Sequence, residues 1–218
     1  MKGHIFMTAI IAIKKNNEIY IGADGVRTCE PNIEHLSDCQ STWKIKRILG
    51  SKHCFIATSG DANCGQVIKN IPNLLDGKED ISYNYLINRV IPKIFKICKQ
   101  SCDTYSENDY GYEIKCSIII TTLNKLFLIN DYGRVLESNE MVCMGIGKTQ
   151  LMLKYQEIRN EDLDAREMVL KCLDHAVSYG RNIGYPLMMM NNINDNAEYI
   201  ESKNEIEYGY QKSKEKVL

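Results

Sequence analysis

The sequence lacks the features that would place the protein in a membrane, outside the cell or on nucleic acid. No apolar run in its 218 residues is long enough to span a bilayer, and no apolar core of a secretory signal is visible. The formal net charge of −1 provides no excess positive charge to hold nucleic acid or an anionic membrane surface. We therefore expect a cytoplasmic protein that binds neither.

The nine cysteines do not form the pattern of a disulfide framework. Their number is odd, and without a secretory signal we expect them to be reduced thiols. Cys98 and Cys102 stand at a helical spacing that could hold a metal ion, but no second pair of ligands occurs at a matching spacing. Buried thiols are the better interpretation. We expect neither a metal site nor another cofactor.

The stretch around which the chain is organised is a predicted hairpin near the N-terminus. Residues 8–13 are almost continuously apolar, which is typical of a strand covered on both faces. Residues 15–18 read Lys-Asn-Asn-Glu and predict a tight turn, because asparagine tolerates the left-handed conformation. The second strand ends in Asp24. Because the start of the first strand lies beside the end of the second, we expect Thr8 and Asp24 to be neighbours.

The remaining periodicity predicts strands, two helices, strands, two helices and strands, in that order. Asp61 can cap the first helix, Pro92 is expected to bend the second, and Asp164 with Glu167 resembles a capping box. The predicted strands after the hairpin are 44–48, 54–58, 114–122, 126–129, 134–137, 141–145, 183–190 and 197–200. The polar segment 29–42 is long for a connection and is therefore expected to be functional.

This order of elements favours an α+β fold, a four-layer αββα sandwich in which two sheets pack face to face between pairs of helices. The chain shows no linker. We expect residues 8–211 to form one domain, residues 1–7 to be an N-terminal extension and residues 212–218 to be a polar tail.

Four short motifs occur in a fixed order along the chain. Thr8 opens the first strand and is followed by Gly-Ala-Asp-Gly at 22–25 and by Thr28. Lys-Ile-Lys-Arg-Ile follows at 44–48, Ile-Ala-Thr-Ser-Gly-Asp-Ala at 56–62 and Met-Gly-Ile-Gly at 144–147. Together they resemble proteasome β subunits and HslV-type peptidases, which are N-terminal-nucleophile (Ntn) hydrolases. The similarity extends from Thr8 to about residue 187, and that family uses the same layered sandwich.

The resemblance implies that Thr8 is the nucleophile and that Asp24 and Lys44 serve it. A hydroxyl attacks well only when a base takes its proton, and a free α-amine on the same threonine can do so near neutral pH. A cationic Lys44 would favour the alkoxide, and Asp24 would keep the lysine charged and oriented. Thr28 would align the substrate backbone as an added strand. Arg27 lies where the family lines its specificity pocket, which would suit acidic side chains.

The oxyanion donor has two candidates in the motif at 56–62. One alignment with the family makes it the backbone N–H of Ala57, which we prefer, and a shifted alignment makes it Gly60. The sequence also departs from active members at two places. Ile146 stands between two glycines where they have serine, and Ser178 and Tyr179 stand near the end of the last long helix where they have aspartate. Either side chain could form a hydrogen bond, but neither is charged at neutral pH.

The implied activity is that of a threonine-type peptidase, which hydrolyses peptides or unfolded proteins through an acyl-enzyme on Thr8. The resemblance also implies a ring-forming homo-oligomer, with a separate ATP-dependent unfoldase as a candidate partner. Two alternatives stay open. The first is a catalytically silent shell or scaffold subunit, which Ile146 and the missing late aspartate favour. The second is a small-molecule amidase of the broader Ntn family.

The mechanism requires a free amine on Thr8, and seven residues precede it. Met7 is directly before Thr8, so translation from Met7 and trimming by methionine aminopeptidase would expose the threonine. The codons for Lys2 and Gly3 can be spelled as a purine-rich run where a bacterial ribosome-binding sequence belongs. We therefore expect Met7 to be the initiator. The alternative is that the extension is real and masks the site.

Overall fold

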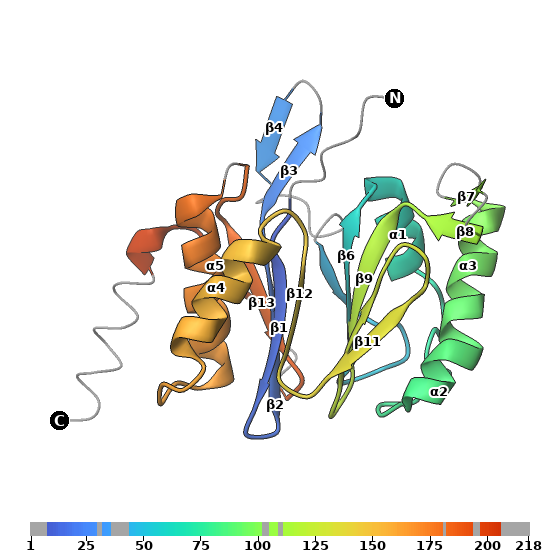
Figure 1. The fold of residues 1–218 in the computed structure, drawn as a ribbon, viewed down its shortest axis with the longest axis horizontal. Coiled ribbons are helices and arrows are strands. Elements are labelled where there is room, and N and C mark those ends of the chain that lie inside the picture. Colours follow the sequence, from blue (N-terminus) through green and yellow to red (C-terminus); the bar gives the residue numbers. More distant parts are fainter. Residues whose placement is uncertain are drawn as a thin grey trace.

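The computed structural model describes residues 8–29, 32–35, 44–101, 105–108, 111–180, 182–193 and 197–205. One antiparallel sheet has the order β12 (Met141–Met144), β1 (Ile10–Lys15), β2 (Glu18–Asp24), β13 (Leu187–Asn191) and β14 (Glu198–Ile200). The second has the order β11 (Val135–Ser138), β10 (Leu126–Ile129), β9 (Cys116–Thr121), β6 (Phe55–Gly60) and β5 (Ile45–Arg47). The two sheets pack face to face (Figure 1).

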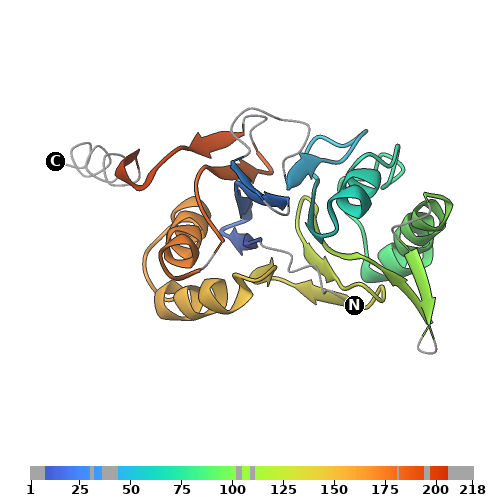
Figure 2. The same ribbon diagram turned by 90° about the horizontal axis from the view of Figure 1, so that it is seen from above.

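Helices cover the outer face of each sheet, as both views show (Figures 1 and 2). The first sheet is covered by α4 (Lys148–Ile158) and α5 (Ala165–Tyr179), and the second by α1 (Ala62–Lys69) and α3 (Ile91–Gln100). A short helix α2 (Tyr83–Tyr85) and a π-helical turn η3 (Leu86–Val90) lead into α3. The α+β, four-layer αββα sandwich predicted from the sequence is therefore confirmed.

Three apolar cores are present: one between the two sheets, and one between each sheet and its helices. They explain why the strands are apolar at consecutive positions. Ile10 and Ala12 of β1 pack between the two sheets, whereas Ile11 and Ile13 face α4 and α5. A strand buried on both faces needs apolar side chains at every position, because successive side chains point to opposite faces. The burial of β1 therefore follows directly from its sequence.

The β1–β2 hairpin fixes which residues meet at its open end. Asn16 and Asn17 have φ angles of 52° and 65°, so both adopt the left-handed conformation that a two-residue turn requires. The register that follows from this turn pairs Ile10 with Ala23, and the N–H of Asp24 donates to the carbonyl of Ala9 at 3.1 Å. The start of β1 and the end of β2 therefore lie side by side.

Some boundaries differ from the sequence-based expectation. Part of the predicted loop 29–42 is a hairpin of β3 (Val26–Cys29) and β4 (Asn32–His35), and the other residues of that loop lie outside the described ranges. The predicted strand 114–122 is divided at residue 115. Its first residue belongs to β8 (Gly111–Ile114), which pairs with β7 (Tyr105–Asn108). The strand predicted at 183–190 begins only at Leu187, as β13, after a cis peptide bond between Tyr185 and Pro186.

Pro92 lies inside a continuous helical segment that α2, η3 and α3 form together. It is the second residue of α3 and lies close behind the π-helical turn η3, and such turns are a common irregularity of helices near a proline. The bend expected at Pro92 stays a prediction.

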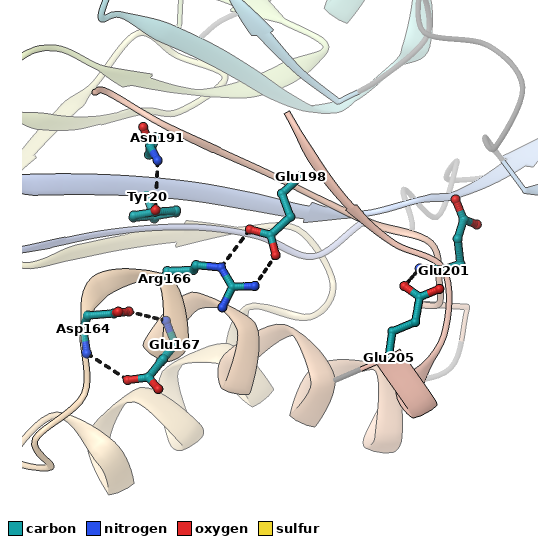
Figure 3. A network of polar contacts seen from close by, with 8 residues as sticks. All are labelled: Tyr20, Asp164, Arg166, Glu167, Asn191, Glu198, Glu201 and Glu205. Atoms are coloured by element: carbon teal, nitrogen blue, oxygen red, sulfur yellow. Dashed lines mark hydrogen bonds and ion pairs between the residues drawn. The ribbon is translucent and has the colours of Figure 1, made fainter. Parts of the chain in front are cut away.

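The start of α5 is held by two sets of polar contacts (Figure 3). The carboxylate of Asp164 accepts from the N–H of Glu167 at 2.7 Å, and the Glu167 carboxylate accepts from the N–H of Asp164 at 3.2 Å. The predicted capping box is therefore confirmed. Arg166 donates from Nε to Glu198 of β14 at 2.8 Å, and a second nitrogen of its guanidinium bonds the other oxygen. These contacts fasten α5 to the edge of the first sheet.

Six cysteines whose side chains the structure describes are buried and lie outside any disulfide: Cys54, Cys64, Cys98, Cys116, Cys143 and Cys172. Burial raises the pKa of Cys54 to about 12, which keeps that thiol protonated. Cys102 lies outside the described residues. Within the described residues, no group of three or more histidine, cysteine, aspartate or glutamate side chains could hold a metal ion. No helix in the same ranges is both long and apolar enough to cross a membrane.

Candidate active site

Asp24 is the centre of a polar cluster at the open end of the β1–β2 hairpin. Its side chain is fully buried, with 0 % exposed. Its Oδ1 accepts from the N–H of Ala9 at 2.7 Å and from Nζ of Lys44 at 2.6 Å, and Oδ2 accepts from the N–H of Val26 at 3.3 Å. The carboxylate therefore joins the residue after Thr8 to a lysine from the other sheet.

Lys44 belongs to the edge of the second sheet. It directly precedes β5, and its carbonyl accepts from the N–H of Thr58 on β6 at 3.1 Å. Its ammonium group crosses to Asp24, so the expected pairing of these two residues is present. Lys46, two residues later, instead donates to Oδ1 of Asn70. Only one of these two lysines therefore contacts Asp24.

The ionisation of this pair is governed by burial. Burial lowers the pKa of Lys44, because an ammonium group loses hydration in the protein interior, and the adjacent Asp24 carboxylate opposes that effect. Burial likewise raises the pKa of Asp24, against the lowering by Lys44 and by the N–H of Ala9. Each charge therefore depends on the other. An ammonium group whose pKa is lowered also gives up its hydrogen-bonded protons more readily.

Thr8 is held from the opposite side by the loop between β12 and α4. Thr8 is buried, and its carbonyl accepts from the N–H of Gly147 at 3.2 Å. Gly145 has a φ of +92°, and a Cβ built on it would lie 2.0 Å from the carbonyl oxygen of Thr8. Only glycine fits there. Because β1 lies between β12 and β2, Thr8 is flanked by residues 145–147 on one side and by Asp24 on the other.

The strand geometry does not favour Ala57, the oxyanion donor preferred from the sequence. The N–H of Thr58 points to Lys44, so the N–H groups of its neighbours in the strand point the other way, to β9. Ala57 is paired with Ile119 of β9 and is fully buried in the sheet interior. Its N–H is therefore directed at a ladder partner and away from Thr8. Sequence motifs alone do not reveal this alternation, which depends on the register of a distant strand.

Gly60 is the better candidate for the oxyanion donor, which needs a backbone N–H directed out of the sheet. It is two residues after Thr58, so the same alternation directs its N–H to the sheet edge that Lys44 occupies. It ends β6 with a φ of +137°, and a Cβ built on it would lie 2.4 Å from the carbonyl oxygen of Lys115. Asp61 follows and caps α1 by accepting from the N–H of Cys64. The backbone at Gly60 is thus fixed between a strand and a capped helix.

Arg27 and Thr28 lie on β3, which begins one residue after Gly25 and pairs with β4. Their backbones are next to the cluster in the chain, but their side chains are outside the described parts of the structure. The roles assigned to them stay predictions.

The flank of Thr8 that residues 146–147 and Ile183 form is apolar. Ile146 is 48 % exposed, and a Cβ built on Gly147 would lie 2.7 Å from Cβ of Ala9 and 2.8 Å from Cδ1 of Ile183. Ile183 also packs against Gly180, whose Cβ would lie 2.5 Å from it. Sequence reasoning missed this contact. The signal that could have revealed it is the isoleucine between glycines at 180 and 184, a pattern that allows close packing on both sides.

The two polar candidates at the end of α5 do not enter this flank as expected. Ser178 is exposed, and Tyr179 is 70 % exposed with its ring against His175, the ring centroids lying 4.6 Å apart. Helical geometry explains why both side chains are exposed. They follow the buried Ala176 and lie on the outward face of the last turn of α5.

The sequence matches no protein-family model, and no curated protein matches it. Its structure, however, is similar to those of several solved proteins. BPH from Thiobacillus denitrificans has a TM-score of 0.70 at 16 % identity, covering 86 % of this chain and 100 % of that one. The same protein in complex with epoxomicin has a TM-score of 0.67 at 14 % identity, covering 89 % and 100 %. The eukaryotic HslV from Trypanosoma brucei has a TM-score of 0.60 at 15 % identity, covering 84 % and 98 %.

These similarities cover 98 % or more of each solved chain and 84 % or more of this one. They agree with the fold expected from the ordered motifs. The chain therefore has the α+β sandwich of Ntn-hydrolase, proteasome-subunit-like proteins, the fold that it shares with BPH and HslV.

Proposed function

We propose that the protein is a threonine-type peptidase of the proteasome/HslV kind, which hydrolyses peptide bonds through an acyl-enzyme on Thr8. The observation that carries this proposal is the buried Asp24 carboxylate, which binds both Lys44 Nζ and the N–H of the residue after Thr8. A fully buried ion pair costs free energy through desolvation, so its position at the start of β1 favours a chemical role.

In the proposed reaction, Oγ1 of Thr8 attacks the carbonyl carbon of the scissile bond and passes its proton to the free α-amine of the same residue. The oxygen of the tetrahedral intermediate accepts from the N–H of Gly60. The C–N bond then breaks, the leaving amine takes the proton, and an ester on Thr8 remains. A water molecule hydrolyses that ester. Lys44 favours the alkoxide by its charge, and Asp24 orients Lys44.

The relationship to BPH supports this proposal. BPH has been solved in complex with epoxomicin, a peptide epoxyketone. Epoxyketones are electrophiles that can bond to both the hydroxyl and the α-amine of an N-terminal threonine. They therefore test for a free amine and a reactive hydroxyl at the same time.

We expect the active form to begin at Thr8. A chain produced from Met7 should lose its methionine and be labelled by epoxomicin, because Thr8 then carries the amine that the mechanism needs. A chain that retains residues 1–7 should not be labelled. Intact mass spectrometry of both forms, before and after incubation with epoxomicin, measures the N-terminus and the adduct together. Labelling of a protein that still begins at Met1 would contradict the proposed mechanism.

We also propose that the protein forms a homo-oligomeric ring in the cytoplasm and receives peptides or unfolded proteins as substrates, with an ATP-dependent unfoldase as a candidate partner. Both outer helix layers carry exposed apolar side chains, among them Met152 and Leu153 on α4 and Ile87 near α3. Exposed apolar side chains on two faces suit contacts with other subunits. Sedimentation velocity at micromolar concentration should give a species of six or seven subunits per ring. A stable monomer would contradict this expectation.

A catalytically silent subunit of the same fold is the second candidate. The apolar flank formed by Ile146, Ile183 and Gly180 favours it, because no charged side chain from these positions assists the α-amine. The epoxomicin experiment separates the two candidates. A silent subunit with Thr8 at its N-terminus would remain unlabelled.

A further inference from the structure

The loop of residues 145–147, which flanks Thr8, has no role in the reaction proposed above. We propose that Ile146 binds the side chain that follows the scissile bond and makes the protein prefer an apolar residue there. This inference rests on the proposed function, because it concerns the same site.

The topology separates the two sides of the site. Asp24 lies on the side of Thr8 that faces β2, and Lys44 reaches it from the second sheet, to which Gly60 also belongs. The carbonyl under attack must point to that side, where the Gly60 N–H is directed. β3 continues from β2 on the same side, so the acyl part of the substrate approaches along it. The amine that leaves therefore extends to the opposite flank, where β12 ends in the loop 145–147.

The position of Ile146 is fixed by its two neighbours. Gly145 lies against the Thr8 carbonyl so closely that no Cβ fits, and Gly147 both donates to that carbonyl and packs against Ala9. A side chain carried between two such residues cannot move away from Thr8 without breaking these contacts. Ile146 is therefore held beside the residue that would carry the acyl group.

The chemistry of this flank is apolar and accessible. Ile146 is 48 % exposed, whereas Ile183 is 7 % exposed and packs under the loop against Gly147. Burial of a branched apolar side chain against another one is favourable, and desolvation of a charged or polar side chain on the same surface is costly. The surface should therefore accept leucine or phenylalanine after the scissile bond and disfavour serine or aspartate. A contact with one apolar side chain typically changes kcat/KM by about tenfold or more.

Internally quenched peptides that differ only in the residue after the scissile bond test this inference. The protein that begins at Thr8 should cleave the leucine peptide with a kcat/KM about tenfold above that of the serine peptide. In Ile146→Ser the ratio should fall to within about twofold, since the apolar contact is lost. The matched control is Ile193→Ser. Ile193 is 55 % exposed and lies just beyond the end of β13 that pairs with Tyr20, away from Thr8, so this variant should keep the tenfold preference.

Failure of this inference can be told apart from failure of the proposed function. Epoxomicin has no residue on the leaving-group side, so Ile146→Ser should still be labelled at Thr8. Absence of labelling in the parent protein would remove the proposed function and this inference with it. Labelling of both proteins with the same leucine-to-serine ratio would overturn the inference alone. If Ile146→Ser dissociates the oligomer and the ratio is unchanged, Ile146 belongs to a subunit contact and the inference is likewise wrong.

Discussion

Thr8→Ala should abolish peptide cleavage, with a loss on the order of 10⁴-fold or more, as for removal of other catalytic hydroxyl nucleophiles. The change deletes only the hydroxyl and one methyl group at a position before β1, so the sandwich should keep its stability within about 1 kcal/mol. The amine, the Asp24–Lys44 ion pair and the loop 145–147 all remain. The measurement is kcat/KM on a fluorogenic peptide, together with the mass of the epoxomicin adduct and the midpoint of urea unfolding.

Thr8→Ser provides the matched control, since it retains a hydroxyl and the capacity for an N-terminal amine. It should remain labelled and keep measurable turnover. If the Thr8→Ala variant loses Met7 normally, remains folded and still forms the epoxomicin adduct, the nucleophile is another residue. The assignment of the site is then wrong. An equal loss of kcat/KM in Thr8→Ala and Thr8→Ser would show that packing of the threonine methyl group matters and that the hydroxyl is not the nucleophile.

The parts of the site that the sequence predicted are those set by local rules. The Asn16–Asn17 turn fixes the hairpin register, and that register alone places the end of β2 beside the start of β1. The pairing of Asp24 with Lys44 was expected from the resemblance, and the structure contains it. Capping of α1 by Asp61 and of α5 by Asp164 also follows from residues three positions apart.

The parts that the sequence did not predict depend on contacts between distant segments. The direction of the Ala57 N–H is set by the hydrogen bond from Thr58 to Lys44 and by pairing with Ile119, which no local motif encodes. The approach of Ile183 to Gly147 is set by the packing of α5 against the first sheet. The same dependence on distant contacts applies to β13, which begins at Leu187 and not at residue 183, because Gly184 and Pro186 pack against Val26 and Gly25.

Lys44→Ala should also abolish turnover, but it changes the fold as well as the chemistry. Removal of the lysine leaves the Asp24 carboxylate buried without its cation, which destabilises a protein by about 3–5 kcal/mol. A loss of activity in this variant alone would therefore not separate a catalytic role from a structural one. Lys46→Ala is the control at the same strand. Lys46 bonds Asn70 away from Asp24, so its removal should leave most of the turnover.

The double variant Asp24→Asn, Lys44→Met separates the two roles. Both side chains become neutral at similar volume, so no unpaired charge is left, and its free energy of unfolding should be closer to that of the parent than that of Lys44→Ala. Its kcat/KM should nevertheless remain lower by about 10²–10⁴-fold, because no cation favours the Thr8 alkoxide. The two quantities are measured by urea unfolding and peptide cleavage. A folded double variant with parental turnover would show that the ion pair stabilises the end of the hairpin and takes no part in the reaction.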